Sequence, residues 1–327
     1  MKELSFGPVA PPCVVFPRTS CYRPGPGALL ALLLLAVVVW IDMQFLRVTF
    51  RNVERPVAIV GVPLLLAFYG QARALNCQVV SGCRMLGIFF GMFLSATILQ
   101  YLFAIHGAGR ELVDQRLLAI DHALGLDPAT FTALWDRSAI ACDMLFVIYN
   151  SLHWQMAIII VALLFLRDYE TFDALVISMI ALIFIGSAIA AAAPAIGFTG
   201  VSDIGFTNTA VAGGRVGQSN FLALRSGLMP VIDLDDMPGI ITFPSGHAAL
   251  GMLMILVARG VPYALWPFTI LNLAMLPSII VHGGHYFADI IAGVLIMLVF
   301  WPLARRLAAG GQRLKTRQTP TPPLVGG

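Results

Sequence analysis

Long apolar runs separated by shorter polar segments dominate the chain of 327 residues. A membrane-spanning helix needs about 20 consecutive apolar residues, within a range of about 17 to 25. We predict spanning helices at residues 28–46, 57–72, 85–105, 140–166, 172–193, 243–258, 262–281 and 285–304. The second run is the weakest, because Gly61 and Pro63 interrupt it. The expected fold is all-α: a polytopic transmembrane helical bundle with about eight spanning helices.

The composition agrees with this pattern. Hydrophobic residues make up 59% of the chain and charged residues only 11%, whereas soluble domains contain about 25% charged residues. The formal net charge is only +3, so we expect the bilayer as a partner and no nucleic acid. Nothing in the sequence sets the oligomeric state.

The Lys and Arg residues predict the orientation, because cytoplasmic segments carry an excess of them. With both termini cytoplasmic, the inner segments hold 12 of the 20 Lys and Arg residues, including those of the basic tail. Arg47, Arg51 and Arg55 argue the other way. We therefore predict an integral protein, of a bacterial inner membrane, with both termini in the cytoplasm. Cys21 and Cys77 then lie on the cytoplasmic side, where we expect no disulfide.

Two of the predicted outer segments are long. Residues 195–242 are rich in Gly, Asp and Asn, and loops of this length without regular structure are usually functional or disordered. Residues 106–139 contain apolar positions at helical spacing, which predicts an amphipathic helix lying on the membrane face. Those positions are Leu112, Val113, Leu117, Ile120 and Leu124.

The stretch FPSGHAAL at residues 243–250 places polar residues where a spanning run begins. The N-terminus of a helix offers free backbone N–H groups and a partial positive charge, which suits a phosphate. Ser245 and Gly246 would supply such donors, and Gly246 would let a ligand approach the backbone. His247 would lie above this position, able to give or take a proton.

A second polar stretch, HGGHYFADIIAG at residues 282–293, opens the last spanning run. His285 and Asp289 are four residues apart, so on a helix they share a face and can touch. A carboxylate bonded to one imidazole nitrogen fixes the tautomer and makes the other nitrogen more basic. Two spans and a tight turn separate His247 from His285, so both histidines lie at the same depth on the same side.

These motifs resemble the type 2 phosphatidic acid phosphatase superfamily, which also includes the vanadium haloperoxidases. The resemblance rests on PSGH at residues 244–247, followed by S-x6-H-x3-D at Ser278, His285 and Asp289. It implies a covalent mechanism in which His285 attacks phosphorus and Asp289 orients it. His247 would protonate the leaving alkoxide.

In the same resemblance, Ser245 and Gly246 would hold phosphate oxygens. It further implies a six-helix phosphatase-like core at residues 81–305. A cytoplasmic tail at 1–27 and two accessory helices at 28–80 would precede it, and a basic cytoplasmic tail at 306–327 would follow.

The chain departs from the family pattern where cations are expected. Ile279 follows Ser278 where the family usually has Arg, and AAAPAIGFTGV at residues 191–201 lacks the usual Lys-x6-Arg-Pro. We therefore predict Arg225 first and Arg215 second as the phosphate ligands, with His282 as a further possibility. This altered pattern, with its HGGHY, looks like the inositol phosphorylceramide synthase-like branch.

We expect a membrane lipid phosphatase that acts on a lipid phosphate at the extracytoplasmic face and needs neither a metal nor an organic cofactor. One alternative is a phosphotransferase that moves a phospho-headgroup to a lipid or polyol acceptor. Another is a metal-dependent membrane enzyme or transporter, in which His247, His282, His285 and Asp289 bind zinc. The third is a non-catalytic transporter or scaffold. The identity of the lipid and the choice between hydrolysis and transfer stay open.

Overall fold

The computed structural model describes residues 21–46, 48–201, 205–209, 212–228, 231–235 and 237–317. Within these residues the chain forms twelve helices and one two-stranded sheet. The all-α bundle predicted from the apolar runs is confirmed, and each predicted span corresponds to a helix. These helices are α1 (Pro26–Leu46), α2 (Glu54–Ala72), α3 (Cys77–His106), α6 (Ala139–Leu166), α7 (Tyr169–Ala192), α10 (Gly246–Ala258), α11 (Leu265–Gly283) and α12 (Phe287–Arg317).

Seven of these helices are long and apolar enough to cross a membrane, and α10 is the shorter exception. Its 13 residues extend only about 20 Å at 1.5 Å per residue, against a hydrocarbon core of about 30 Å. The sequence pattern overestimated this span, because Phe243 and Pro244 continue the apolar run although the helix begins only at Gly246. Ser245, the N-cap residue of α10, is fully buried, so this helix begins inside the bundle.

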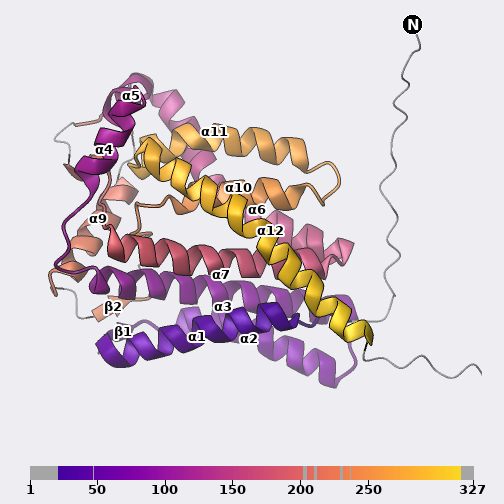
Figure 1. Ribbon diagram of the computed structural model, residues 1–327. Helices are drawn as coiled ribbons and strands as arrows, with labels where there is room; N and C mark the ends of the chain where they lie inside the picture. Colours follow the sequence, from indigo (N-terminus) through magenta and orange to yellow (C-terminus); the bar gives the residue numbers. More distant parts are fainter. Residues whose placement is uncertain are drawn as a thin grey trace, which may run out of the picture.

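The described helices alternate in direction, which gives the bundle two distinct ends (Figure 1). One end carries every short element and is here called the loop end. These elements are β1 (Thr49–Arg51), α4 (Asp114–Ala123), α5 (Pro128–Trp135), α8 (Phe198–Val201), α9 (Ala212–Arg225) and β2 (Val231–Asp233). The opposite end holds the start of α1, the turn between α2 and α3, and the end of α12.

The segment expected to be a long irregular loop contains regular structure where it is described. It holds α8, α9 and β2, and β2 pairs in parallel with β1, with Phe50 opposite Ile232. This pairing brings acidic and basic residues together: Arg51 bonds Asp233 at 2.8 Å and Arg55 bonds Asp235 at 3.4 Å. Two arginines that weakened the orientation argument are therefore paired with carboxylates.

Helix α7 forms the centre of the bundle and is the most buried of the spanning helices. It packs against α3, α12 and α1. By contrast, α1 and α2 bury only a small part of their apolar surface. Apolar side chains that stay exposed on a spanning helix face lipid, so these two helices lie at the periphery of the bundle.

The expectation that no disulfide forms is wrong, because Cys21 and Cys77 are bonded with their Cα atoms 4.9 Å apart. Tyr22 holds this N-terminal segment in place: its N–H donates to Ser81 Oγ at 2.8 Å and its hydroxyl to Asp173 Oδ1 at 2.7 Å. The bond lies at the end opposite the loop end. Disulfides persist in oxidising compartments, so the disulfide and the Lys and Arg count favour opposite orientations.

Reporter fusions would separate these two orientations. If the Lys and Arg count is decisive, a fluorescent protein fused after Arg317 becomes fluorescent in the cytoplasm, and alkaline phosphatase fused after Gly125, at the loop end, becomes active outside it. The opposite result would be active alkaline phosphatase when fused after Arg317 and a fluorescent protein when fused after Gly125. It would contradict the predicted orientation and place the disulfide outside the cytoplasm.

Candidate active site

The second polar stretch forms the turn between α11 and α12 at the loop end. Helix α11 ends at Gly283, and Gly284 follows with a φ of +69°. This left-handed conformation, which glycine adopts without strain, is a common way to end a helix. Helix α12 begins only at Phe287. His285 therefore lies in the turn. The sequence pattern had predicted that it begins the helix.

His285 and Asp289 nevertheless make the contact expected from their spacing. Nδ1 of His285 lies 3.2 Å from Oδ2 of Asp289, and the same oxygen accepts the N–H of Tyr286 at 2.9 Å. All three side chains are buried. Because a carboxylate only accepts hydrogen bonds, Nδ1 carries the proton and Nε2 keeps its lone pair. This leaves Nε2 as the ring nitrogen with a free lone pair.

The start of α10 is fixed directly against this turn. Ser245 is the N-cap of α10, with its Oγ 3.3 Å from the N–H of Ala248. Its own N–H donates to the backbone carbonyl of Asp289 at 3.0 Å. Gly293 permits this close approach, because a Cβ there would collide with the carbonyl oxygen of Ser245. A Cβ on Gly246, in contrast, would meet no atom within 4 Å, so space is open beside the helix start.

His247 is held by Tyr149, a residue of α6 that the sequence reasoning missed. The two rings stack with centroids 4.1 Å apart and planes 16° apart, and Tyr149 Oη lies 3.4 Å from His247 Nδ1. A Cβ placed on Gly283 would lie 3.3 Å from His285 Nε2 and 3.4 Å from Tyr149 Oη. Tyr149 thus borders the same small space as both histidines. The only sequence signal was the polar stretch YNSLHW inside an apolar run.

Helix α4 supplies two buried carboxylates that the sequence reasoning also missed. Asp121 accepts the N–H groups of Phe287 and Ala288, each at 2.8 Å. These are among the N–H groups that a helix start leaves without an intrahelical partner. Asp121 therefore holds the beginning of α12 and, with it, the turn that carries His285.

Asp114 lies on the same face of α4 as Asp121 and joins this turn to the segment between α7 and α8. It accepts the N–H of Gly197 at 2.9 Å and the hydroxyl of Tyr286 at 3.2 Å. Burial raises the pKa of the Asp114 carboxyl, while the N–H groups of Ile196 and Gly197 oppose that change. Burial, followed by the nearby Asp114 charge, raises the pKa of Tyr286, so its hydroxyl stays protonated and can donate.

A helix does form within residues 106–139, but two of its acidic side chains face the protein and not water. Asp114, Leu117 and Asp121 share its buried face, whereas Ile120 is 49% exposed and Leu124 is 55% exposed. Seven residues separate the two acids, which places them on the same side of the helix. That spacing, alongside Leu117, was the signal available in the sequence.

The predicted phosphate ligands occupy different places on α9. The Arg225 guanidinium donates to the carbonyl oxygens of Gly107 and Arg110, at the end of α3, and stacks on the ring of Phe221. Two of its N–H donors are therefore used within the protein, and phosphate binding by Arg225 stays a prediction. The side chain of Arg215 lies outside the described residues.

The backbone position of Arg215 is nevertheless informative. Arg215 lies three residues before Gln218 and so on the same face of α9. Gln218 donates to Ile196 O and Thr199 Oγ1, each at 2.8 Å. A Cβ on Gly284 would lie 2.5 Å from that same Oγ1. This face of α9 is thus directed towards the turn that carries His285.

His282 and Ser278 both contact backbone carbonyl oxygens. His282 Nε2 lies 2.9 Å from the carbonyl oxygen of Cys142, which joins α11 to α6. Ser278 donates to the carbonyl of Met275 in its own helix at 2.7 Å. In the described part of the chain, no group of three or more His, Cys, Asp or Glu side chains is arranged to hold a metal ion. The zinc alternative therefore has no ligand set there.

Replacing Asp121 by Ala should weaken the start of α12. Loss of such a cap typically costs about 0.5–2 kcal/mol, so we expect a lower free energy of unfolding together with a lower kcat. Asp127→Ala is the matched control, because Asp127 caps α5 through Ala129 and Thr130 and does not contact the turn. Equal effects of both substitutions on kcat would contradict a positioning role for Asp121.

Comparison with known proteins gives one match. The family model of the PAP2 superfamily matches residues 115–303, from α4 to the greater part of α12 and including both histidine motifs. No curated protein and no solved structure matches the chain. The match covers more than half of the 327 residues. It agrees with the resemblance carried by PSGH and by Ser278, His285 and Asp289, and the chain therefore belongs to the PAP2 superfamily.

Proposed function

We propose that this protein is an integral membrane phosphatase that acts on a lipid phosphate through a phosphohistidine intermediate. Membership in the superfamily supports a membrane enzyme of the phosphatase or phosphotransferase type. The observation that carries the proposal is the buried His285–Asp289 pair, whose Nε2 borders the same space as the Tyr149 hydroxyl that contacts His247. This arrangement suits His285 as the nucleophile and His247 as the general acid and base.

In the first step, Nε2 of His285 attacks phosphorus. A nitrogen–phosphorus bond forms and the ester oxygen–phosphorus bond breaks. His247 gives its proton to the leaving alkoxide. Asp289 stabilises the positive charge that develops on the imidazole, as a carboxylate bonded to the far nitrogen does.

In the second step, His247 accepts a proton from water as the water oxygen attacks phosphorus. The nitrogen–phosphorus bond breaks, inorganic phosphate leaves and His285 regains its lone pair. Tyr149 keeps the His247 ring in place through both steps by its stacked contact. One general acid–base group therefore serves both halves of the reaction.

A phosphoryl group with about two negative charges needs cations or aligned N–H donors in its transition state. The start of α10 offers backbone donors beside the open space at Gly246. We assign the cation to Arg215 ahead of Arg225, because the Arg215 position lies on the face of α9 that is directed towards the His285 turn. This reverses the order favoured by the sequence alone.

The same phosphoenzyme would also serve a phosphotransferase, in which an alcohol replaces water in the second step. This is the reaction expected of the inositol phosphorylceramide synthase-like branch. Purified protein incubated with phosphatidic acid, with and without inositol, distinguishes the two: release of inorganic phosphate favours the phosphatase, and a new phosphodiester lipid favours the transferase. We place the site at the extracytoplasmic face, as the Lys and Arg distribution predicts.

Trapping the intermediate tests the mechanism. With radiolabelled p-nitrophenyl phosphate, whose leaving group needs no proton, His247→Ala should form the phosphoenzyme but hydrolyse it slowly. We expect an acid-labile, base-stable phosphoprotein in that variant. None should form in His285→Ala, which should lose at least about 1,000-fold in kcat, as enzymes do on losing a nucleophile. His106→Ala, an exposed histidine at the end of α3 that contacts Asp42, is the control. Substantial turnover surviving in His285→Ala would exclude this mechanism.

The two arginines of α9 should respond differently to substitution. Arg215→Ala should lower kcat/KM for a phosphate ester by about tenfold or more, without changing the thermal unfolding midpoint. Arg225→Ala should mainly lower stability, by about 1–3 kcal/mol, because the carbonyls of Gly107 and Arg110 lose their donor. A loss of kcat/KM in Arg225→Ala at unchanged stability would return the phosphate role to Arg225.

A further inference from the structure

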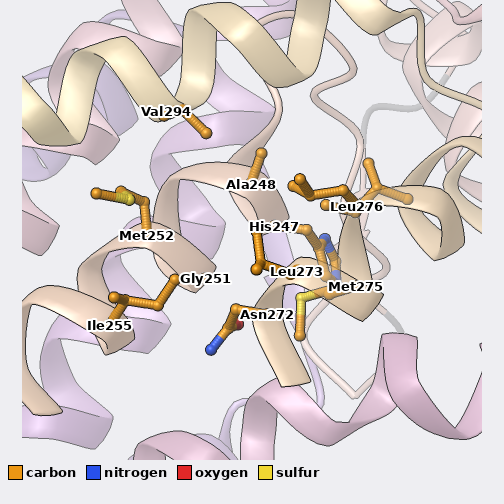
Figure 2. A pocket seen from close by; sticks show the side chains of 11 residues that line it. His247, Ala248, Gly251, Met252, Ile255, Asn272, Leu273, Met275, Leu276 and Val294 are labelled. Atoms are coloured by element: carbon orange, nitrogen blue, oxygen red, sulfur yellow. The ribbon is translucent and has the colours of Figure 1, made fainter. Parts of the chain in front are cut away.

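A cavity of about 130 Å³ lies directly beneath His247, between three helices (Figure 2). Helix α10 contributes His247, Gly251 and Ile255 to its wall, α11 contributes Asn272 and Leu276, and α12 contributes Val294. We call it the α10–α12 cavity. It borders the proposed site, since the proposed acid–base residue His247 forms part of its wall.

The lining of the α10–α12 cavity is almost wholly apolar. Apart from His247, Asn272 is its one polar side chain, and the fully buried Ile279 stands where the family resemblance leads one to expect arginine. An apolar cavity has little affinity for water. Hydrocarbon would gain dispersion contacts there that an empty space cannot give.

The cavity borders the surface that faces lipid. Leu273 lines it and is 57% exposed on α11. Helices α11 and α12 meet near the His285 turn and then diverge along α10 (Figure 1). At Leu273 the cavity wall therefore reaches the lipid-facing surface of the bundle, which is where a chain would pass into the bilayer.

Asn272 limits how deep such a chain can go. Its Nδ2 donates to Gln155 Oε1 at 2.6 Å and to Phe268 O at 2.8 Å, whereas its buried Oδ1 has no hydrogen-bond partner among the described residues. Burying methylene groups against an unpaired carbonyl oxygen is unfavourable. The favourable exit at that level is sideways, past the adjacent Leu273.

We propose that the α10–α12 cavity binds the part of the substrate's hydrocarbon chain that lies next to the phosphate, and that the rest of the chain leaves between α11 and α12 into the bilayer. This inference rests on the proposed function. At about 30 Å³ per group of water size, the cavity holds roughly four such groups, which fits one unbranched chain and not two. The enzyme should therefore prefer long-chain phosphate esters over short ones through contacts with a single chain.

Filling the cavity tests this preference. We expect Val294→Phe to lower the ratio of kcat/KM for dodecyl phosphate to kcat/KM for ethyl phosphate by at least tenfold. Leu298→Phe is the matched control: it lies one turn further along α12, is exposed and does not line the cavity, so its ratio should stay within twofold of the wild type. An unchanged ratio in a folded Val294→Phe protein, or an equal fall in the control, would overturn the inference.

Photocrosslinking gives a measurement that does not need turnover. Dodecyl phosphate with a diazirine on its fourth carbon should label peptides from residues 247–255 and 272–279 of the wild type, and Val294→Phe should greatly reduce this labelling. Labelling confined to other helices would overturn the cavity assignment. Labelling as expected in a protein that acts on no phosphate ester would leave the cavity assignment standing and reject the proposed function.

Discussion

The structure of the candidate site depends on one buried carboxylate. Asp289 accepts hydrogen bonds from the ring of His285 and from the N–H of Tyr286, and its backbone carbonyl accepts the N–H of Ser245. One residue thus orients the proposed nucleophile, shapes the turn before α12 and fixes the start of α10 against it. Gly293 is needed for the same reason, because any side chain there would push the two helix starts apart.

Around this centre, helices outside the two motifs contact the residues of the motifs and the segments beside them. Asp121 and Asp114 of α4 satisfy backbone donors at the start of α12 and at Gly197. Tyr149 of α6 stacks on His247. Isolated carboxylates are costly to bury, and these two are buried because helix starts and turns present N–H groups in pairs. Residues at the loop end therefore hold the two histidines in position as well as covering them.

Several arginines at the loop end bond other parts of the protein. Arg225 serves the end of α3, and Arg51 and Arg55 pair with acids of the β2 segment. Within the described residues, the space beneath His247 is apolar, with Ile279 in its wall. In the proposed function, the start of α10 and Arg215 would bind the phosphate, while α10, α11 and α12 would bind the hydrocarbon chain. The phosphate of a lipid substrate would be bound by charge and hydrogen bonds on one side of His247. Its chain would be bound by apolar contacts on the other side.

By itself, the sequence determined the helices and the local pair. Apolar runs near 20 residues must become helices in a bilayer, since backbone groups cannot stay unpaired there. The four-residue spacing also predicted the contact between Asp289 and His285, although His285 lies in the turn before α12. Tertiary structure decided the rest. Tyr149 meets His247, Asp121 meets Phe287 and Cys21 meets Cys77 across 56 to 166 residues of chain. Such contacts depend on how helices pack, and no local periodicity encodes which faces meet.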